Sequence, residues 1–187
     1  MDFQKECNMI LSYHEIHELL ETAVVVNADP ANVNGSSLDI RLAPIILREK
    51  PNPTQSTITN LRDKIPMKMD SFKIPEKGYL FAPGTFILAS SVEVFNLPLN
   101  ISAQYFLKSS MGRIGLDHCL AGWCDAGWHG SVLTLELQNV SRFHIVRLFA
   151  GDLIGQMVFH KHLPVPADRS YAARGRYNND ATVKGMK

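Results

Sequence analysis

Apolar and polar residues alternate along much of the chain, and a period of two is typical of β-strands whose two faces differ. The segment SVLTLELQN, residues 131–139, shows the pattern clearly. Leu133, Leu135 and Leu137 share one face, while Glu136 lies in the middle of the other. Because antiparallel sheets commonly expose one face to water, the pattern alone favours a solvated surface position for Glu136. Only other parts of the sequence can give this carboxylate a different role.

One segment near the start has the helical period instead. Ser12 and Glu15 have the spacing of a capping box, and the apolar residues that follow recur on one helical face. We therefore predict a short amphipathic helix over residues 13–21. After this helix the pattern predicts strands, and the first of them is SSLDIRL, residues 36–42.

Residues 49–77 are polar and carry several prolines, so we expect a long excursion there, with short strands around STIT and MKMDSF. The strands that follow, from YLFAPGTFILASSVEVF onward, are short and closely spaced, with a tight turn at Pro83 and Gly84. Many short strands at near-regular spacing indicate an all-β sandwich or barrel. The sequence shows neither an internal repeat nor a domain boundary.

The C-terminal segment LPVPADRSYAARGRYNNDATVKGMK, residues 163–187, contains few aliphatic side chains. Such a segment cannot form a hydrophobic core of its own. We expect it to be either disordered or laid over another part of the protein.

The composition narrows the class of protein. The 187 residues suffice for one sizeable core, and 45% of them are hydrophobic. A formal net charge of +1 gives no reason to expect a nucleic-acid or membrane surface, because both usually need a basic excess. No apolar run approaches the roughly 18 residues of a membrane span, and the N-terminus lacks the basic-then-apolar order of a secretion signal. We expect a cytoplasmic protein.

The three cysteines, Cys7, Cys119 and Cys124, are too few for a disulfide framework. Cys119 and Cys124 have neighbouring histidines, His118 and His129, which raises the question of a zinc site. Their C-x4-C spacing lies outside the usual range of structural zinc ligands, and no second cysteine pair follows. The spacing therefore favours buried thiols over a metal site.

A second polar cluster follows an apolar strand in FLKSSMGRIGL, residues 106–116. Lys108, Ser109, Ser110 and Arg113 bring two cations and two hydroxyl groups close to the backbone amides around a glycine. Such a group of donors is suited to phosphate. The pattern is not a P-loop, and the polar ends of ordinary loops have a similar composition, so both interpretations stay open at this point.

Three motifs in a fixed order, KSSMGRIGL, AGWCDAGWHG and TLELQN, resemble those of the dCTP deaminase family, which has the dUTPase-like fold. SSLDIRL, APGTFILASSVEVFNLP and GDLIGQMVF extend the resemblance over nearly the whole chain. It implies an all-β protein, a distorted jelly-roll-like β-barrel with a short N-terminal helix. It also implies a single domain over residues 1–187, in which residues 170–187 form a mobile C-terminal lid over the triphosphate.

The resemblance implies an activity and the residues that carry it. The family deaminates dCTP hydrolytically to dUTP and ammonia, and one subgroup continues to dUMP and diphosphate; AGWCD is similar to the A-G-[FW]-I-D of that subgroup. By this resemblance, Glu136 is the base that moves protons between the attacking water, N3 and the leaving amine. Arg113 and Ser109 hold the water and the glutamate, and the guanidinium keeps the carboxylate ionised. Asp125 receives the sugar 3′-hydroxyl, and in the dUTPase branch it also activates the hydrolytic water.

The resemblance also implies a wider set of substrate contacts, from the phosphate cradle, the GQ strand and the C-terminal segment: Lys108, Ser109, Ser110, Arg113, Asp125, Gln156, Tyr171, Arg174, Arg176 and Asp180. We expect no protein metal ligands, because the H-x-E and P-C-x-x-C pair of the zinc deaminases is absent. Mg²⁺ is expected on the nucleotide phosphates. The implied partners are dCTP, with or without dUTP, and further copies of the chain in a homotrimer with sites at the subunit interfaces.

Several positions depart from the family pattern. The loop DHCLAG, residues 117–122, is one residue shorter, and one extra residue separates Asp125 from Glu136. Lys108 replaces the commoner arginine, and Asp180 replaces a glutamine. An aspartate only accepts hydrogen bonds, which suits the cytosine amine and disfavours carbonyl oxygens. A modified cytosine or another phosphorylation level therefore stays open as the substrate, as do two other functions, a dUTPase without deaminase activity and a non-catalytic nucleotide-sensing trimer.

Overall fold

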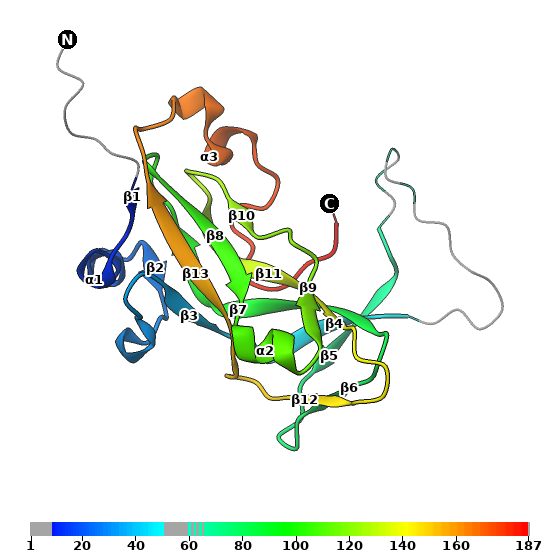
Figure 1. Ribbon diagram of the computed structural model, residues 1–187. Helices are drawn as coiled ribbons and strands as arrows, with labels where there is room; N and C mark the ends of the chain where they lie inside the picture. The colour runs from blue at the N-terminus through cyan, green and yellow to red at the C-terminus, as the bar shows by residue number, and fades with distance from the viewer. Residues whose placement is uncertain (1–8, 51–59, 61, 63, 65, 187) are drawn as a thin grey trace, which may run out of the picture.

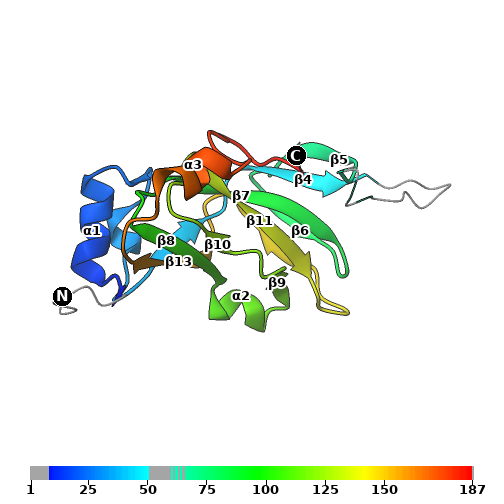
Figure 2. The ribbon, with the colours of Figure 1, turned by 90° about the horizontal axis from the view of Figure 1, so that it is seen from above.

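The structure, a computed structural model (Figure 1), describes these residues: 9–50, 60, 62, 64 and 66–186. The described residues form two antiparallel β-sheets that pack against each other, a small third sheet and three short α-helices. The predicted all-β, jelly-roll-like fold with a short N-terminal helix is confirmed. Figure 2 shows helix α1 (Tyr13–Glu21) at one end of the molecule and the arm made by strands β4 (Ile45–Glu49) and β5 (Met69–Lys73) at the other.

All strand pairs in the two large sheets are antiparallel. The first sheet consists of β1 (Met9–Ile10), β13 (Leu153–Lys161), β8 (Ile101–Leu107), β10 (Trp123–Cys124) and, beside β13, β3 (Leu38–Arg41). The second consists of β5, β4, β7 (Phe86–Asn96), β11 (His129–Asn139), β9 (Leu116–His118) and, beside β7, β2 (Val25–Val26). The remaining elements are the β6 (Tyr79–Phe81) and β12 (Val146–Leu148) pair, helices α2 (Ser109–Arg113) and α3 (Tyr171–Arg174), and 3-10 turns at Pro30–Asn32 and Ala167–Arg169.

Helix α1 begins where the capping box predicts it. The backbone N–H of Ser12 donates to Oε2 of Glu15 at 2.9 Å, and the Ser12 hydroxyl donates to the same oxygen at 2.7 Å. These hydrogen bonds lower the pKa of Glu15, because they stabilise its charged form. Ile16 and Leu19 are buried, so the predicted amphipathic helix is confirmed.

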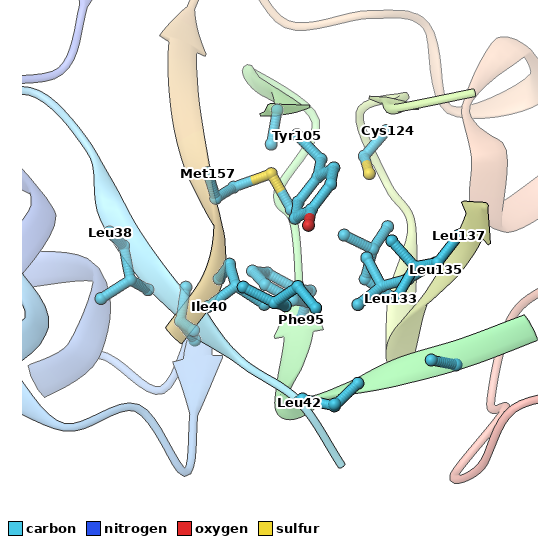
Figure 3. Packing of buried hydrophobic residues seen from close by; sticks show 14 of the residues in the cluster. Leu38, Ile40, Leu42, Phe95, Tyr105, Cys124, Leu133, Leu135, Leu137 and Met157 are labelled. Carbon is cyan, nitrogen blue, oxygen red and sulfur yellow. The ribbon is translucent and has the colours of Figure 1, made fainter. Parts of the chain in front are cut away.

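Strand β11 lies in the centre of the second sheet, between β7 and β9. Leu135 and Leu137 are fully buried and Leu133 is nearly so, as the alternation predicts. These leucines point into the space between the sheets, where Figure 3 shows them packed near Phe95 and Tyr105. One face of β11 therefore belongs to the core, and the side chains of the other face, including Glu136, point away from it.

Two further predictions of strands and turns are confirmed. SSLDIRL contains β3, and Leu38, Ile40 and Leu42 are fully buried. Gly84 has a φ of +73°, a conformation that glycine adopts without strain, and it forms the tight turn between β6 and β7. MKMDSF contains β5, whereas the strand predicted at STIT lies outside the described residues.

The structure corrects two local predictions. Ser109–Arg113 forms helix α2 where the sequence predicted a polar loop after a strand. The segment is too short to show a helical period, and it contains no β-branched residue that would oppose a single turn of helix. Cys119 is exposed, although it was predicted to be buried like Cys124, because it follows β9 into the loop that leads to β10.

The C-terminal segment is laid over β11, which is one of its two predicted arrangements. The backbone N–H of Val132 donates to the carbonyl oxygen of Asp180 at 2.9 Å, and that of Asn179 donates to the carbonyl oxygen of His129 at 3.1 Å. Val183 is buried in this arrangement. Figures 1 and 2 show the segment, in red, running past β11 toward the β4–β5 arm. Its mobility as a lid stays a prediction.

Among the described residues, we find no helix with both the length and the apolar composition needed to span a membrane.

A buried ion pair joins β3 to β7. Glu93 is fully buried, and its Oε1 accepts a hydrogen bond from Nε of Arg41 at 2.8 Å. Its Oε2 accepts a second one from the backbone N–H of Arg41 at 3.1 Å. The pair therefore connects the first sheet with the second through a carboxylate that is fully buried and a guanidinium that is partly exposed.

We expect Glu93→Ala to destabilise the protein by about 1–3 kcal/mol, because it leaves the backbone N–H of Arg41 without its acceptor and removes the ion-pair partner of the partly exposed guanidinium. The measurement is the free energy of unfolding by chemical denaturation. Glu18→Ala, which removes an exposed carboxylate from α1, is the control and should change that free energy by about 0.5 kcal/mol or less. Equal effects of the two substitutions would contradict this role of the ion pair.

Candidate functional site

The outer face of β11 forms the floor of a cavity of about 550 Å³. Thr134 and Glu136 of β11 line it, next to Phe86 and Leu88 of β7. The strand register explains this arrangement, because Glu136 lies directly opposite Leu88, and Gln138 directly opposite Phe86. Cross-strand partners share a face of the sheet, so the polar side chain emerges among apolar ones.

Glu136 has a close neighbour on the other side of β11. Nε2 of His118, a buried residue of β9, lies 3.2 Å from Oε2 of Glu136. This distance suits an ion pair, but the alignment makes no hydrogen bond, and both atoms are buried without any hydrogen-bond partner among the described residues. A buried acceptor in this state is able to bind a donor from a ligand or a water. His118 had only an uncertain family counterpart in the shortened loop, so sequence reasoning did not include it in the site.

A second layer of side chains packs behind His118. The ring of Tyr105 lies 4.6 Å from the imidazole of His118, measured between centroids. Tyr105 in turn lies over Gly155 of β13, where an added β-carbon would be only 2.1 Å from the phenol ring. Burial, with a smaller effect from the negative charge of Glu136, raises the pKa of Tyr105. The phenol therefore stays protonated at neutral pH.

The thiols near Glu136 are held in their protonated form in the metal-free protein. Burial, aided by the charges of Asp125 and Glu136, raises the pKa of Cys124 to about 12. Burial also raises the pKa of Cys119, and the charges of Asp117 and Glu136 add to the effect. A zinc ligand must be a thiolate, which these environments disfavour. Within the described part of the chain, no group of three or more His, Cys, Asp or Glu residues could hold a metal ion.

Asp125 lies at the edge of the same cavity, just after β10. Its Oδ1 accepts a hydrogen bond from the indole N–H of Trp123 at 2.8 Å. Asp125 and Tyr171 also line a second cavity of about 350 Å³, which contains Arg169 and Arg174. The predicted sugar-binding carboxylate therefore stands between an apolar cavity and a cationic one.

Residues of the C-terminal segment also line the large cavity. Tyr171 and Asp180 line it, and Asp180 is buried and ion-paired with Lys184. Arg174 lies in the second cavity, where its Nε donates to the carbonyl oxygen of Asp168 at 3.0 Å. Arg176 lines neither of these two cavities. The structure thus brings Tyr171 and Asp180 to Glu136 and Asp125, and holds the two arginines further out.

The other predicted residues form a separate group at α2. Ser109, Ser110 and Arg113 are exposed on this helix, and neither they nor Lys108 line the two cavities. Lys108 is ion-paired with Asp39 of β3. Gln156 lies opposite Asp39 in the pairing of β13 with β3 and lines neither cavity, so its predicted contact with the substrate stays a prediction.

Within one subunit, Arg113 and Glu136 are not joined by any ion pair between described residues. The predicted site is therefore divided between two surfaces of the chain. One surface carries the carboxylates Glu136 and Asp125, and the other carries the exposed cations and hydroxyl groups of α2.

Comparison with known proteins identifies the family of the chain. Residues 10–162 match the family model described as dCTP deaminase-like. Two similar relatives bear the name dCTP deaminase, dUMP-forming. That of Hydrogenobaculum sp. (strain Y04AAS1) is 36% identical over 85% of this chain and 86% of its own length, and that of Dictyoglomus thermophilum is 34% identical over 91% and 90%.

A solved structure supports the fold. The 2′-deoxycytidine 5′-triphosphate deaminase from Agrobacterium tumefaciens superimposes with a TM-score of 0.66 at 22% sequence identity, over 83% of this chain. The chain spans about half, 49%, of the length of that structure's chain. Together with the family model, these similarities show that the chain belongs to the dCTP deaminase-like family.

Proposed function

We propose that the protein hydrolyses dCTP to dUTP and ammonia, with Glu136 as the proton-transferring base. The observation that carries this proposal is the state of the Glu136 carboxylate. It stands on the open face of an otherwise apolar strand, in a cavity large enough for a nucleoside, with one oxygen buried and lacking a hydrogen bond. The names of the relatives support dCTP as the substrate.

The reaction needs a group that first takes a proton and then gives protons back. Water must lose a proton as it attacks C4 of cytosine, and N3 and the departing amine must each gain one. A carboxylate within hydrogen-bond distance of all three positions can perform these transfers in turn. His118, at 3.2 Å from Glu136, is suited to keep the carboxylate oriented while it does so.

The exposed group on α2 suggests how the triphosphate is held. Lys108, Ser109, Ser110 and Arg113 offer charges and hydroxyl groups for phosphate oxygens, but they lie outside the cavity of their own subunit. We infer that α2 of one subunit serves the Glu136 cavity of a neighbour in a homotrimer. In this arrangement Arg113 reaches the neighbour's carboxylate, and its guanidinium favours the ionised form.

Mg²⁺ is proposed to arrive on the phosphates of the nucleotide. A magnesium site usually combines substrate phosphates with one or two carboxylates and several waters. Lys108, which is ion-paired with the buried Asp39, stands where these phosphates are proposed to bind. Phosphate oxygens would also compete with Asp39 for the Lys108 ammonium group.

A second step, the cleavage of dUTP to dUMP and diphosphate, is favoured by one specific observation. Asp125 is exposed at the edge between the large cavity and a cavity that contains Arg169 and Arg174. A carboxylate there can activate a water beside a bound phosphate chain. The words "dUMP-forming" in the names of the relatives and the motif AGWCD support this proposal. The C-terminal segment, which carries Tyr171, is proposed to close over the bound nucleotide.

Glu136→Gln preserves the shape of the side chain but removes its basicity. We expect ammonia release from dCTP to fall by about 10²–10⁴-fold, the usual effect of losing a general acid–base group. Coupled ammonia detection measures the rate, and calorimetry measures whether dCTP still binds. Glu76→Gln, at an exposed position outside the cavity, is the control and should retain full activity. Near-wild-type ammonia release by the Glu136 variant would contradict the proposed role and show that Glu136 is an ordinary surface residue. Absence of ammonia release from the wild-type protein would favour a dUTPase or a nucleotide sensor instead.

Asp125→Asn tests the second step separately. The substitution should lower diphosphate release from added dUTP by about 10²–10⁴-fold, whereas ammonia release from dCTP should fall less. Chromatography of the products from dCTP and dUTP measures both steps at once. Asp70→Asn, which alters an exposed carboxylate on β5, serves as the matched control. If both steps decline in parallel, Asp125 binds the sugar only and has no separate role in hydrolysis.

The mechanism also makes a prediction about metals. A zinc-selective chelator should leave ammonia release unchanged when Mg²⁺ is resupplied, since the carboxylate mechanism uses no metal-bound water and the nearby thiols are held protonated. The measurement is the rate of ammonia release before chelation, after chelation, and after zinc or Mg²⁺ is added back. Recovery with zinc alone would rule out the carboxylate mechanism.

A further inference from the structure

A serine and a histidine that the proposed mechanism does not use form a hydrogen-bonded pair. Oγ of Ser102, on β8, lies 3.0 Å from Nε2 of His162, the residue that follows β13. Nδ1 of His162 lies 2.8 Å from the carbonyl oxygen of Leu163. A carbonyl oxygen only accepts hydrogen bonds, so in the neutral ring Nδ1 carries the hydrogen. Nε2 of that ring therefore accepts the hydroxyl hydrogen of Ser102.

Ser102 belongs to the wall of the second cavity, the one of about 350 Å³ beside Asp125. The residue is only 5% exposed, yet it lines this cavity together with Arg169 and Arg174. In Figure 1, β8 begins and β13 ends at the end of the molecule where α3 lies, which brings these residues together. The cavity therefore combines two guanidinium groups of the C-terminal segment with a buried hydroxyl group of the first sheet.

These groups suit an anion of the phosphate type. Guanidinium and hydroxyl groups form strong, charge-assisted hydrogen bonds with phosphate oxygens. The carboxylate of Asp125 opposes an anion in the same cavity, but the two arginines outnumber it. At roughly 30 Å³ for each water-sized group, inorganic diphosphate needs about 270 Å³, whereas a nucleoside triphosphate needs several times more. The charge and the size of the second cavity therefore match diphosphate, the leaving group of the proposed second step.

We propose that the second cavity binds inorganic diphosphate and that this binding places a proton on His162. The hydroxyl hydrogen of Ser102 turns to a phosphate oxygen, which leaves Nε2 of His162 without its donor. Nε2 then takes one proton from the solvent and donates it in a new hydrogen bond to Oγ of Ser102. The inference rests on the proposed second step for the identity of the anion, and it adds a place where the leaving group is retained.

The charged groups around His162 act in both directions before an anion binds. The carboxylates favour the protonated ring, and the neighbouring cations oppose it. Bound diphosphate adds negative charge to the cavity and so shifts this balance toward the protonated ring. The titratable and charged groups on the surrounding elements are those of Asp125, His160, Lys161, Asp168, Arg169 and Arg174.

Calorimetric titration with sodium diphosphate tests the site. Ser102→Ala and Arg174→Gln should each lower the affinity for diphosphate by about tenfold or more, because each removes a charge-assisted hydrogen bond inside the cavity. Ser71→Ala and Arg142→Gln make the same chemical changes outside both cavities and should leave the affinity unchanged. Absence of diphosphate binding by the wild-type protein overturns the proposal. Equal affinities of the wild type and Ser102→Ala also overturn it, because they show that exposed arginines attract an adventitious ion only.

A second measurement counts the protons. The same titration in two buffers with different heats of ionisation gives the proton uptake on binding, and the difference between two proteins removes the contribution of diphosphate itself. We expect greater uptake by the wild type than by His162→Gln, whereas His144→Gln, at an exposed position outside both cavities, should match the wild type. Equal uptake by the wild type and His162→Gln overturns the proposal. Because glutamine retains a hydrogen-bonding group near Ser102, this comparison decides the question even if Ser102→Ala fails to fold.

The binding experiment separates this inference from the function on which it rests. Diphosphate binding that depends on Ser102 and His162, in a protein that forms no dUMP from dUTP, supports the anion site and contradicts the proposed second step. Formation of dUMP without such binding contradicts the anion site alone.

Discussion

The pairing register of β11 with β7 is the constraint on which the rest of the molecule depends. Because side chains alternate along a strand, a slip of one residue would exchange the two faces completely. Leu135 and Leu137 would leave the core, and Glu136 would enter it opposite the first sheet. The cost of burying an unpaired carboxylate and exposing two leucines makes the observed register strongly favoured. The stability of the core and the position of the carboxylate are therefore two results of the same pairing.

The two carboxylates of the site have different surroundings, and the difference suits different tasks. Glu136 faces a buried imidazole on one side and apolar side chains on the other, so few groups compete for its free oxygen. Asp125 is exposed and is oriented by the indole of Trp123. A carboxylate that is partly shielded from water is suited to exchange protons with the cytosine ring. A carboxylate at an open edge is suited to contact sugar and phosphate groups.

Local patterns in the sequence predicted the features that depend on local rules. The capping box of α1, the alternation in β3 and β11 and the turn at Gly84 each follow from neighbouring residues. The catalytic role proposed for Glu136 could not be inferred from its strand, and it was the similarity of several ordered motifs to one family that suggested it.

Other features were out of reach because they depend on distant parts of the chain. His118 approaches Glu136 only because β9 pairs with β11, and no spacing in the sequence encodes that contact. Helix α2 is one turn long, too short for a period to appear. The path of the C-terminal segment over His129 and Val132 is set by backbone hydrogen bonds, which its own composition does not reveal.

The contact of Tyr105 with Gly155 has a consequence for how this protein can change over evolutionary time. The phenol ring occupies the volume where any other residue at position 155 would have its β-carbon, and the same ring supports the imidazole beside Glu136. A mutation of Gly155 to alanine would displace the Tyr105 ring, which contacts His118, and His118 in turn lies beside the carboxylate of Glu136. Position 155 has no side chain that could contact a ligand, yet few substitutions are tolerated there, because the volume of a side chain is already occupied by the Tyr105 ring.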